Sequence, residues 1–144
     1  LLFLLILGFG YGRAVPLNYA ALGRWGGLWV ALAGPLTNLL IALLCALVMR
    51  FAPPSALLDI ILATVASVNV MLAVFNLLPL PMLDGSRIVA ALFPRTLGRS
   101  LAEFEAAPYS GIAVMLVILL GQRAIGQLIA AVQGWLFAFA GVGL

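Results

Sequence analysis

Long apolar runs separated by short polar segments dominate this chain. Two runs, residues 28–49 and 56–78, are long enough to cross a bilayer, which takes about 20 apolar residues in a helix. Residues 1–9 form a shorter apolar run, which we expect to be the end of a span that begins upstream of Leu1. This pattern predicts membrane-spanning helices.

The remainder of the chain predicts further helical segments. Residues 94–107 are polar for this sequence, and residues 109–120 predict a further, short span. The sequence GQR then predicts a tight turn before a last span over residues 124–144. We therefore expect an all-α polytopic membrane protein with about four to five transmembrane segments. Residues 1–144 would form a single membrane-embedded core, truncated at its N-terminus.

The composition supports lipid as the solvent. Hydrophobic residues make up 66% of the chain and charged residues only 8%, whereas soluble domains carry about 25% charged residues. The formal net charge of +3 comes from dispersed arginines, so a clustered basic face for nucleic acid is excluded. The chain has no histidine, and its one cysteine, Cys45, is interpreted as a small buried hydrophobe.

The distribution of arginine predicts the orientation. If the spans alternate, loops 10–27 and 92–108 share one side of the membrane. The arginines are Arg13, Arg24, Arg95 and Arg99 on that side and Arg50 and Arg123 on the other. Because basic residues are enriched in cytoplasmic loops, the first side is predicted to be cytoplasmic.

The second clear span ends in the sequence NLLPLPMLDG, residues 76–85, which interrupts the helix. Pro79 and Pro81 lack an N–H group and clash with the preceding helical turn. Each also favours extended backbone at the residue before it. Since lipid cannot pair with free backbone groups, the break must be covered by protein or line a cavity. After Gly85 the sequence SRIVAALF predicts a new helix.

Asp84 stands at this break. A carboxylate at the centre of a bilayer costs about 2.5–3.5 kcal/mol on insertion scales, so its presence needs an explanation. In one interpretation Asp84 is the N-cap of the resuming helix, pairs with Arg87, and Asn76 caps freed carbonyl groups. In the other, Asp84 and Asn76 belong to a functional site. The residues themselves leave both interpretations open.

A second motif, AGPLTN at residues 33–38, lies inside the first clear span. Gly34 permits a close approach of helices, Pro35 bends the helix, and Asn38 needs a polar partner in lipid. Ordinary helix packing would explain this motif if it stood alone. Because the chain crosses the membrane and returns, however, we expect the two motifs to lie at similar depth and to meet.

The two motifs together resemble the site-2 protease family of intramembrane zinc metalloproteases. The flanking sequences FGYGRAVPLN and FPR are similar to that family as well. The resemblance implies that Asp84 is a zinc ligand and that Asn76 orients the substrate or an oxyanion. It also implies that the following residues shape the core around the site: Gly34, Pro35, Asn38, Pro79, Pro81 and Gly85.

The family also carries a helix with the motif H-E-x-x-H, which supplies two histidine ligands and a general base. This sequence has no histidine, so we expect that helix upstream of Leu1 and expect residues 1–144 alone to be inactive. The resemblance implies an intact zinc-dependent endopeptidase, in a bacterial cell membrane, that cleaves transmembrane protein substrates nearer the cytoplasmic face.

Two alternatives remain. The first is an inactive, site-2-protease-like membrane scaffold. The second is a transporter with discontinuous helices, although the sequence shows no second broken helix of an inverted repeat.

Overall fold

The structure is a computed structural model that describes residues 19–53 and 55–142, without the side chains of residues 19–21. This part of the chain is helical and contains no strand, which confirms the predicted all-α class. The expected half-span at residues 1–9 lies outside the described residues. The elements are α2 (Tyr19–Phe51), α3 (Ala56–Leu77), α4 (Asp84–Leu92), the π-helical turn η1 (Pro94–Gly98), α5 (Arg99–Glu105) and α6 (Ser110–Ala140).

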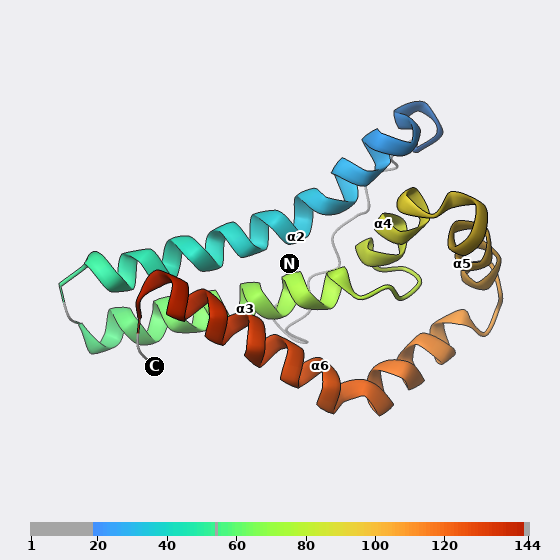
Figure 1. Cartoon of the computed structure of the whole chain (residues 1–144). Coiled ribbons are helices and arrows are strands. Elements are labelled where there is room, and N and C mark those ends of the chain that lie inside the picture. Colours follow the sequence, from blue (N-terminus) through green and yellow to red (C-terminus); the bar gives the residue numbers. More distant parts are fainter. Residues whose placement is uncertain (1–18, 54, 143–144) are drawn as a thin grey trace, which may run out of the picture.

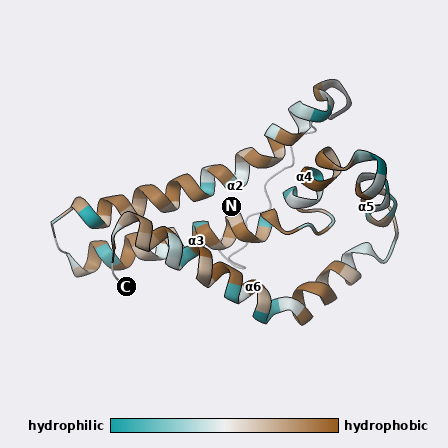
Figure 2. Cartoon of the chain, viewed as in Figure 1, coloured by the Kyte–Doolittle hydropathy of each residue, from teal (hydrophilic) through white to brown (hydrophobic). Residues whose placement is uncertain are grey.

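Within the described residues, three helices are long and apolar enough to cross a membrane: α2, α3 and α6. The first two contain the apolar runs 28–49 and 56–78, as predicted. Most of their large apolar side chains are exposed, and Figure 2 shows hydrophobic residues along the whole length of each helix. An exposed apolar surface of this extent is suited to contact with lipid rather than with water.

The C-terminal helix differs from the prediction. α6 is continuous from Ser110 to Ala140, so residues 121–123 continue a helix and the predicted tight turn is wrong. Glycine in a helix interior costs only about 1 kcal/mol, and glutamine and arginine are good helix formers. Leaving backbone groups unpaired in an apolar surrounding would cost more. In Figure 1 the helix bends along its orange part without ending.

Small residues bring the three long helices together. α2 and α3 lie side by side and antiparallel, and the last part of α6 packs against both near the loop that joins them (Figure 1). The buried cluster at this crossing consists of Ala42, Ala46, Ala66, Val70, Val74, Leu136, Phe137 and Ala140. Alanines at such a crossing allow helix backbones to approach closely, which is how helices associate in lipid.

A polar link adds to this contact. The side-chain amide of Gln133 on α6 donates a hydrogen bond of 2.6 Å to the hydroxyl of Ser67 on α3. That hydroxyl in turn donates to the carbonyl oxygen of Ala63, at 2.7 Å. The side-chain amide of Gln133 and the hydroxyl of Ser67 are therefore paired with each other at the contact between α6 and α3.

The end of α6 is fixed to the end of α2. Gly141 adopts a left-handed conformation with φ 72° and ψ 27°, and the N–H of Val142 donates to the carbonyl oxygen of Phe137 at 2.9 Å. This is the Schellman arrangement that commonly ends helices. The guanidinium of Arg50 donates to the carbonyl oxygen of Gly141 at 2.8 Å. A positive charge thereby meets the C-terminal end of α6, where the helix dipole favours it.

We predict that Ala66→Leu destabilises the helix crossing, because its Cβ is fully buried between helices. Overfilling a packed core costs about 1–3 kcal/mol. Ala56→Leu on the same helix is the matched control, since Ala56 is exposed and should tolerate the larger side chain. Thermal unfolding of both variants in detergent measures the difference. Equal melting temperatures would show that the alanine is not needed for close packing.

Candidate functional site

The motif at residues 76–85 forms a loop between two helices. α3 ends at Leu77, and Leu78 is extended with φ −59° and ψ 136°, as expected for a residue before proline. The N–H of Leu83 donates to the carbonyl oxygen of Leu80 at 3.1 Å and closes a turn with Pro81 and Met82 at its centre. Pro81 is buried within this loop.

Met82 carries the strain of this turn. Its φ of 71° lies in the left-handed region, as at the third residue of a type II turn, which commonly has proline at its second position. Glycine takes this conformation freely, whereas a residue with a side chain pays about 1–2 kcal/mol. The tight turn brings the chain back toward the end of α3.

Asp84 is the first residue of α4, and it is not the N-cap. The N-cap position is held by Leu83, whose backbone is extended and whose side chain makes no hydrogen bond to the helix. The hydroxyl and the N–H of Ser86 both donate to the carbonyl oxygen of Leu83, at 2.8 Å and 3.2 Å. Asp84 therefore does not occupy the position from which a side chain caps α4.

Gly85 allows α4 to stack on the end of α3. A Cβ atom at Gly85 would lie 2.2 Å from the carbonyl oxygen of Leu78 and 2.4 Å from that of Leu77. Real Cβ atoms do not approach backbone atoms this closely, so only glycine fits. The last carbonyl groups of a helix have no partner within the helix, and here the first turn of α4 covers them. This contact fixes where Asp84 emerges.

The two sequence motifs meet at Asp84, as predicted. A Cβ atom at Gly34 on α2 would lie 3.4 Å from Asp84 Oδ2, which is van der Waals contact. Pro35, the next residue, is fully buried. The backbone of α2 therefore borders the carboxylate directly.

The carboxylate of Asp84 is accessible and only loosely paired. Its Oδ1 atom lies 3.8 Å from Nη1 of Arg87, one turn further along α4. The side chains of Asp84 and Arg87 are 30% and 47% exposed. Ion pairs of this length and exposure contribute about 0–1 kcal/mol. Asp84 can therefore accept another partner at small cost.

The predicted asparagines lie on the two helices beside the loop. Asn76 is half-buried in the last turn of α3, and Asn38 is half-buried one turn beyond Gly34 on α2. Within the described part of the chain, no hydrogen bond connects either amide to Asp84. Asn69, two turns before Asn76, donates to the carbonyl oxygen of Val65 of its own helix at 2.8 Å.

Arg24 contributes to this region in a way that the sequence did not reveal. Its Nε and Nη2 atoms donate to the carbonyl oxygens of Ala91 and Leu92, the second bond measuring 3.0 Å. Those carbonyls end α4 and would otherwise lack helical partners. The sequence offers no signal for this contact, because it joins residues far apart in the chain.

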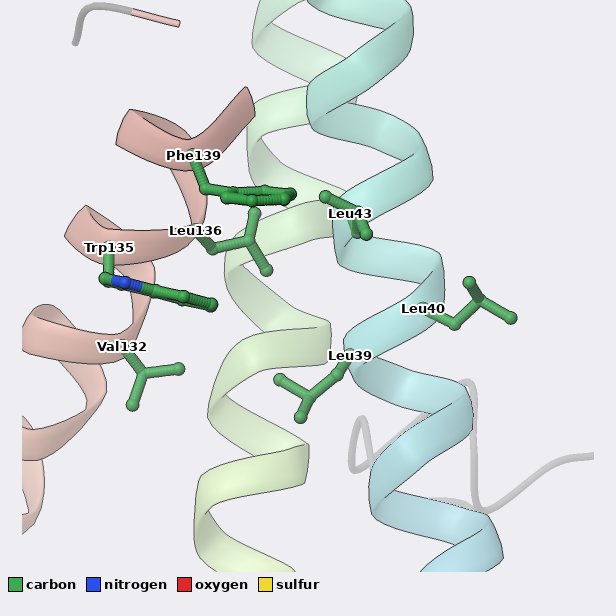
Figure 3. Close-up of a pocket in the computed structure, with 7 residues that line it drawn as sticks. All are labelled: Leu39, Leu40, Leu43, Val132, Trp135, Leu136 and Phe139. Carbon is green, nitrogen blue, oxygen red and sulfur yellow. The ribbon is translucent and has the colours of Figure 1, made fainter. Parts of the chain in front are cut away.

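Among the described residues, one apolar pocket lies away from Asp84, and another borders the loop that precedes it. A groove of about 330 Å³ separates α2 from α6, and Figure 3 shows the side chains that line it. They are Leu39, Leu40, Leu43, Val132, Trp135, Leu136 and Phe139. Another pocket, of about 300 Å³, lies between Pro81 and α5. The groove contains no titratable side chain and cannot supply chemistry by itself.

A catalytic zinc ion takes about three protein ligands, and among the described residues Asp84 is the candidate for one of them. Asp84 fits that role, since it is accessible and one of its oxygens faces the α2 backbone. Within the described ranges, no group of three His, Cys, Asp or Glu side chains could hold a metal ion. Further ligands would have to come from outside these residues.

The fold and the site define a helical membrane protein with a carboxylate at the end of a spanning helix. The sequence profile of peptidase family M50 matches residues 54–120, which include Asn76 and Asp84. This match and the relatives described next confirm the resemblance of the chain to the site-2 proteases.

Two relatives bear names of metalloproteases. The chain is 30% identical over 139 residues to "Putative zinc metalloprotease YwhC" of Bacillus subtilis (strain 168), covering 89% of this chain and 64% of that protein. It is 40% identical over 60 residues to "Putative zinc metalloprotease MJ0611" of Methanocaldococcus jannaschii, covering 42% of this chain and 31% of that protein. The chain thus spans less than two thirds of either relative. No solved structure matches it.

We predict that Gly85→Ala displaces α4, because its methyl group would overlap the carbonyl oxygens of Leu77 and Leu78. The expected loss of stability is about 1–3 kcal/mol or more. Gly126→Ala is the control: Gly126 is helical with open space around it, and alanine there should be neutral or stabilising by up to about 1 kcal/mol. Unfolding curves in detergent compare the two. A Gly85→Ala variant as stable as the wild type would contradict the stacking of α4 on α3.

Proposed function

We propose that this chain is the core of a zinc-dependent intramembrane endopeptidase, which in its intact form hydrolyses a peptide bond of a membrane-embedded protein. The observation that carries the proposal is the accessible carboxylate of Asp84, held against Gly34 at the end of a spanning helix. The match to peptidase family M50 over residues 54–120 and the names of the two relatives support a zinc-dependent reaction.

In this proposal Asp84 is one of the zinc ligands. Its weak ion pair with Arg87 can be given up, and the turn before it directs the carboxylate toward α2. The two histidine ligands and the glutamate base are expected on an H-E-x-x-H helix outside residues 1–144. When bound, the zinc ion would supply Lewis-acid activation of water and of the peptide carbonyl group.

The loop at residues 78–83 is proposed to hold the substrate. A transmembrane substrate must unwind before its peptide bond can be reached, and an unwound strand needs new hydrogen-bond partners in lipid. Extended backbone can provide them by strand addition. Pro79 and Pro81 have no N–H group, so at these positions the loop offers carbonyl acceptors only. The side-chain amide of Asn76 would orient the substrate or donate to the developing oxyanion.

A test of this proposal uses the full-length protein with substitutions at Asp84 and Asn76. Asn in place of Asp84 keeps the size of the side chain but is a poor ligand for zinc, so Asp84→Asn should fold normally and lose zinc and nearly all cleavage. Asn76→Ala should keep zinc and lose activity by about 10²–10³, the usual effect of removing an oxyanion donor. Zinc content and cleavage of a model membrane substrate are measured side by side.

The capping alternative, although Leu83 rather than Asp84 holds the N-cap position of α4, makes the opposite prediction. Asparagine is as good an N-cap as aspartate, so Asp84→Asn would be nearly silent, whereas Asp84→Ala would destabilise the fold by about 1 kcal/mol. Normal zinc content and normal cleavage in Asp84→Asn would refute the ligand role. A wild-type full-length protein without zinc would instead favour the inactive scaffold.

The site is proposed to lie nearer the cytoplasmic face. The bonds from Arg24 to Ala91 and Leu92 place the start of α2 and the end of α4 at the same end of the helices. Arg95 and Arg99 follow directly in the sequence, so this end carries the excess of arginine. Basic residues concentrate on the cytoplasmic side, and the break that precedes Asp84 lies toward this end.

Cysteine labelling in sealed cells tests this orientation. In a Cys45→Ala background, Ser100→Cys on α5 should be protected from a membrane-impermeant reagent added outside. Ser55→Cys, between α2 and α3 at the other end, should be labelled. Both serines are exposed, so the pair is matched in chemistry and accessibility. The reverse pattern would place the site nearer the external face.

A further inference from the structure

Helix α4 is attached to α2 at both of its ends. Its first residue, Asp84, lies beside Gly34, and its last carbonyl groups, at Ala91 and Leu92, accept hydrogen bonds from Arg24. Gly34 and Arg24 are ten residues apart on α2, or about 15 Å, and Asp84 and Leu92 are eight apart on α4, or about 12 Å. The two segments therefore run antiparallel with matching lengths.

Packing against α2 and a smaller contact with α3 also hold α4 in place. The helix has only nine residues, and Gly85 and Ser86, both in its first turn, are its buried members. A helix this short is marginal without tertiary contacts. Its first turn is positioned by the stacking of Gly85 on Leu77 and Leu78. At its other end, the bonds from Arg24 to Ala91 and Leu92 join it to α2.

The geometry of these bonds controls rotation as well as position. The two donors of one planar guanidinium bind the carbonyl oxygens of two successive residues. Hydrogen bonds with a charged donor are about twice as strong as neutral ones, and the C-terminal end of a helix favours a positive charge. The guanidinium also lies 5.1 Å from the centre of the Trp25 ring, which limits its freedom. Because successive helical residues differ by about 100° in direction, rotating α4 by one position would turn Asp84 away from Gly34.

We infer that Arg24 is a positioning residue for Asp84: by binding the C-terminal carbonyls of α4, it sets the rotation of that helix and thus the direction of the carboxylate. The inference rests on the proposed role of Asp84 as a zinc ligand. The hydrogen bonds of Arg24 go to Ala91 and Leu92 rather than to Asp84, so in this inference it acts through the helix.

The test compares two arginines of α2 in the full-length protein. Arg24→Gln removes the guanidinium on α2 that donates to the C-terminal carbonyls of α4. Arg50→Gln likewise removes the guanidinium that donates to Gly141 at the end of α6. We expect Arg24→Gln to weaken zinc binding about 10–100-fold, the usual effect of losing a residue that orients a ligand. Arg24→Lys should fall between, since a lysine keeps the charge without the fork. Arg50→Gln should leave zinc affinity unchanged. Competition with a chelator measures the affinity.

Amide hydrogen exchange gives a readout that needs no metal. Arg24→Gln should accelerate exchange in α4 and leave α6 unchanged, and Arg50→Gln should accelerate it at the end of α6 only. Unchanged zinc affinity and exchange in Arg24→Gln would overturn the inference, and so would an equal loss of zinc affinity in Arg50→Gln. If the wild-type protein holds no zinc, the proposed function fails, and the exchange comparison still decides whether Arg24 anchors α4.

Discussion

The contact of Gly85 with the carbonyl oxygens of Leu77 and Leu78 is the constraint on which the arrangement around Asp84 depends. In lipid an interrupted helix cannot leave its backbone exposed, so whatever follows the interruption has to cover it. The chain does so by turning sharply through Pro81 and Met82 and stacking the next helix on the one it has just left. Any side chain at Gly85 would prevent that contact.

Helix α2 provides the frame for the other elements. Its middle carries small residues that admit α3 and α6, and Gly34 lies beside the carboxylate of Asp84. Near each of its ends an arginine donates hydrogen bonds to C-terminal carbonyls of another helix: Arg24 to those of α4 and Arg50 to that at the end of α6. The first half of α6 contributes little to the core, since its side chains are mostly exposed. The contacts that define this fold are therefore few and lie along one helix.

The sequence predicted the elements that local chemistry determines. Apolar length predicted α2 and α3, Pro79 predicted extended backbone at Leu78, and the return of the chain predicted that Gly34 and Asp84 meet. The turn predicted at residues 121–123 was wrong, because one glycine does not outweigh the helical preference of its neighbours.

Other features could not be predicted from one sequence. The bonds of Arg24 to α4 and the stacking of Gly85 join elements whose relative placement only the fold defines. The roles of Asn76 and Asn38 stay predictions, since their amides make no described contact with Asp84. The donor set for zinc also stays a prediction, because the chain contains no histidine.

The length of α3 determines how far water must travel to the carboxylate. Its 22 residues extend about 33 Å, close to the hydrocarbon thickness of about 30 Å. An upright helix that starts at one interface consequently ends near the other, and the loop and Asp84 follow at that border. Hydration there requires only a shallow opening among headgroups rather than a pore through the bilayer. A hydrolytic site at this border could draw its water from the adjacent aqueous phase, while the helices below it stay dry.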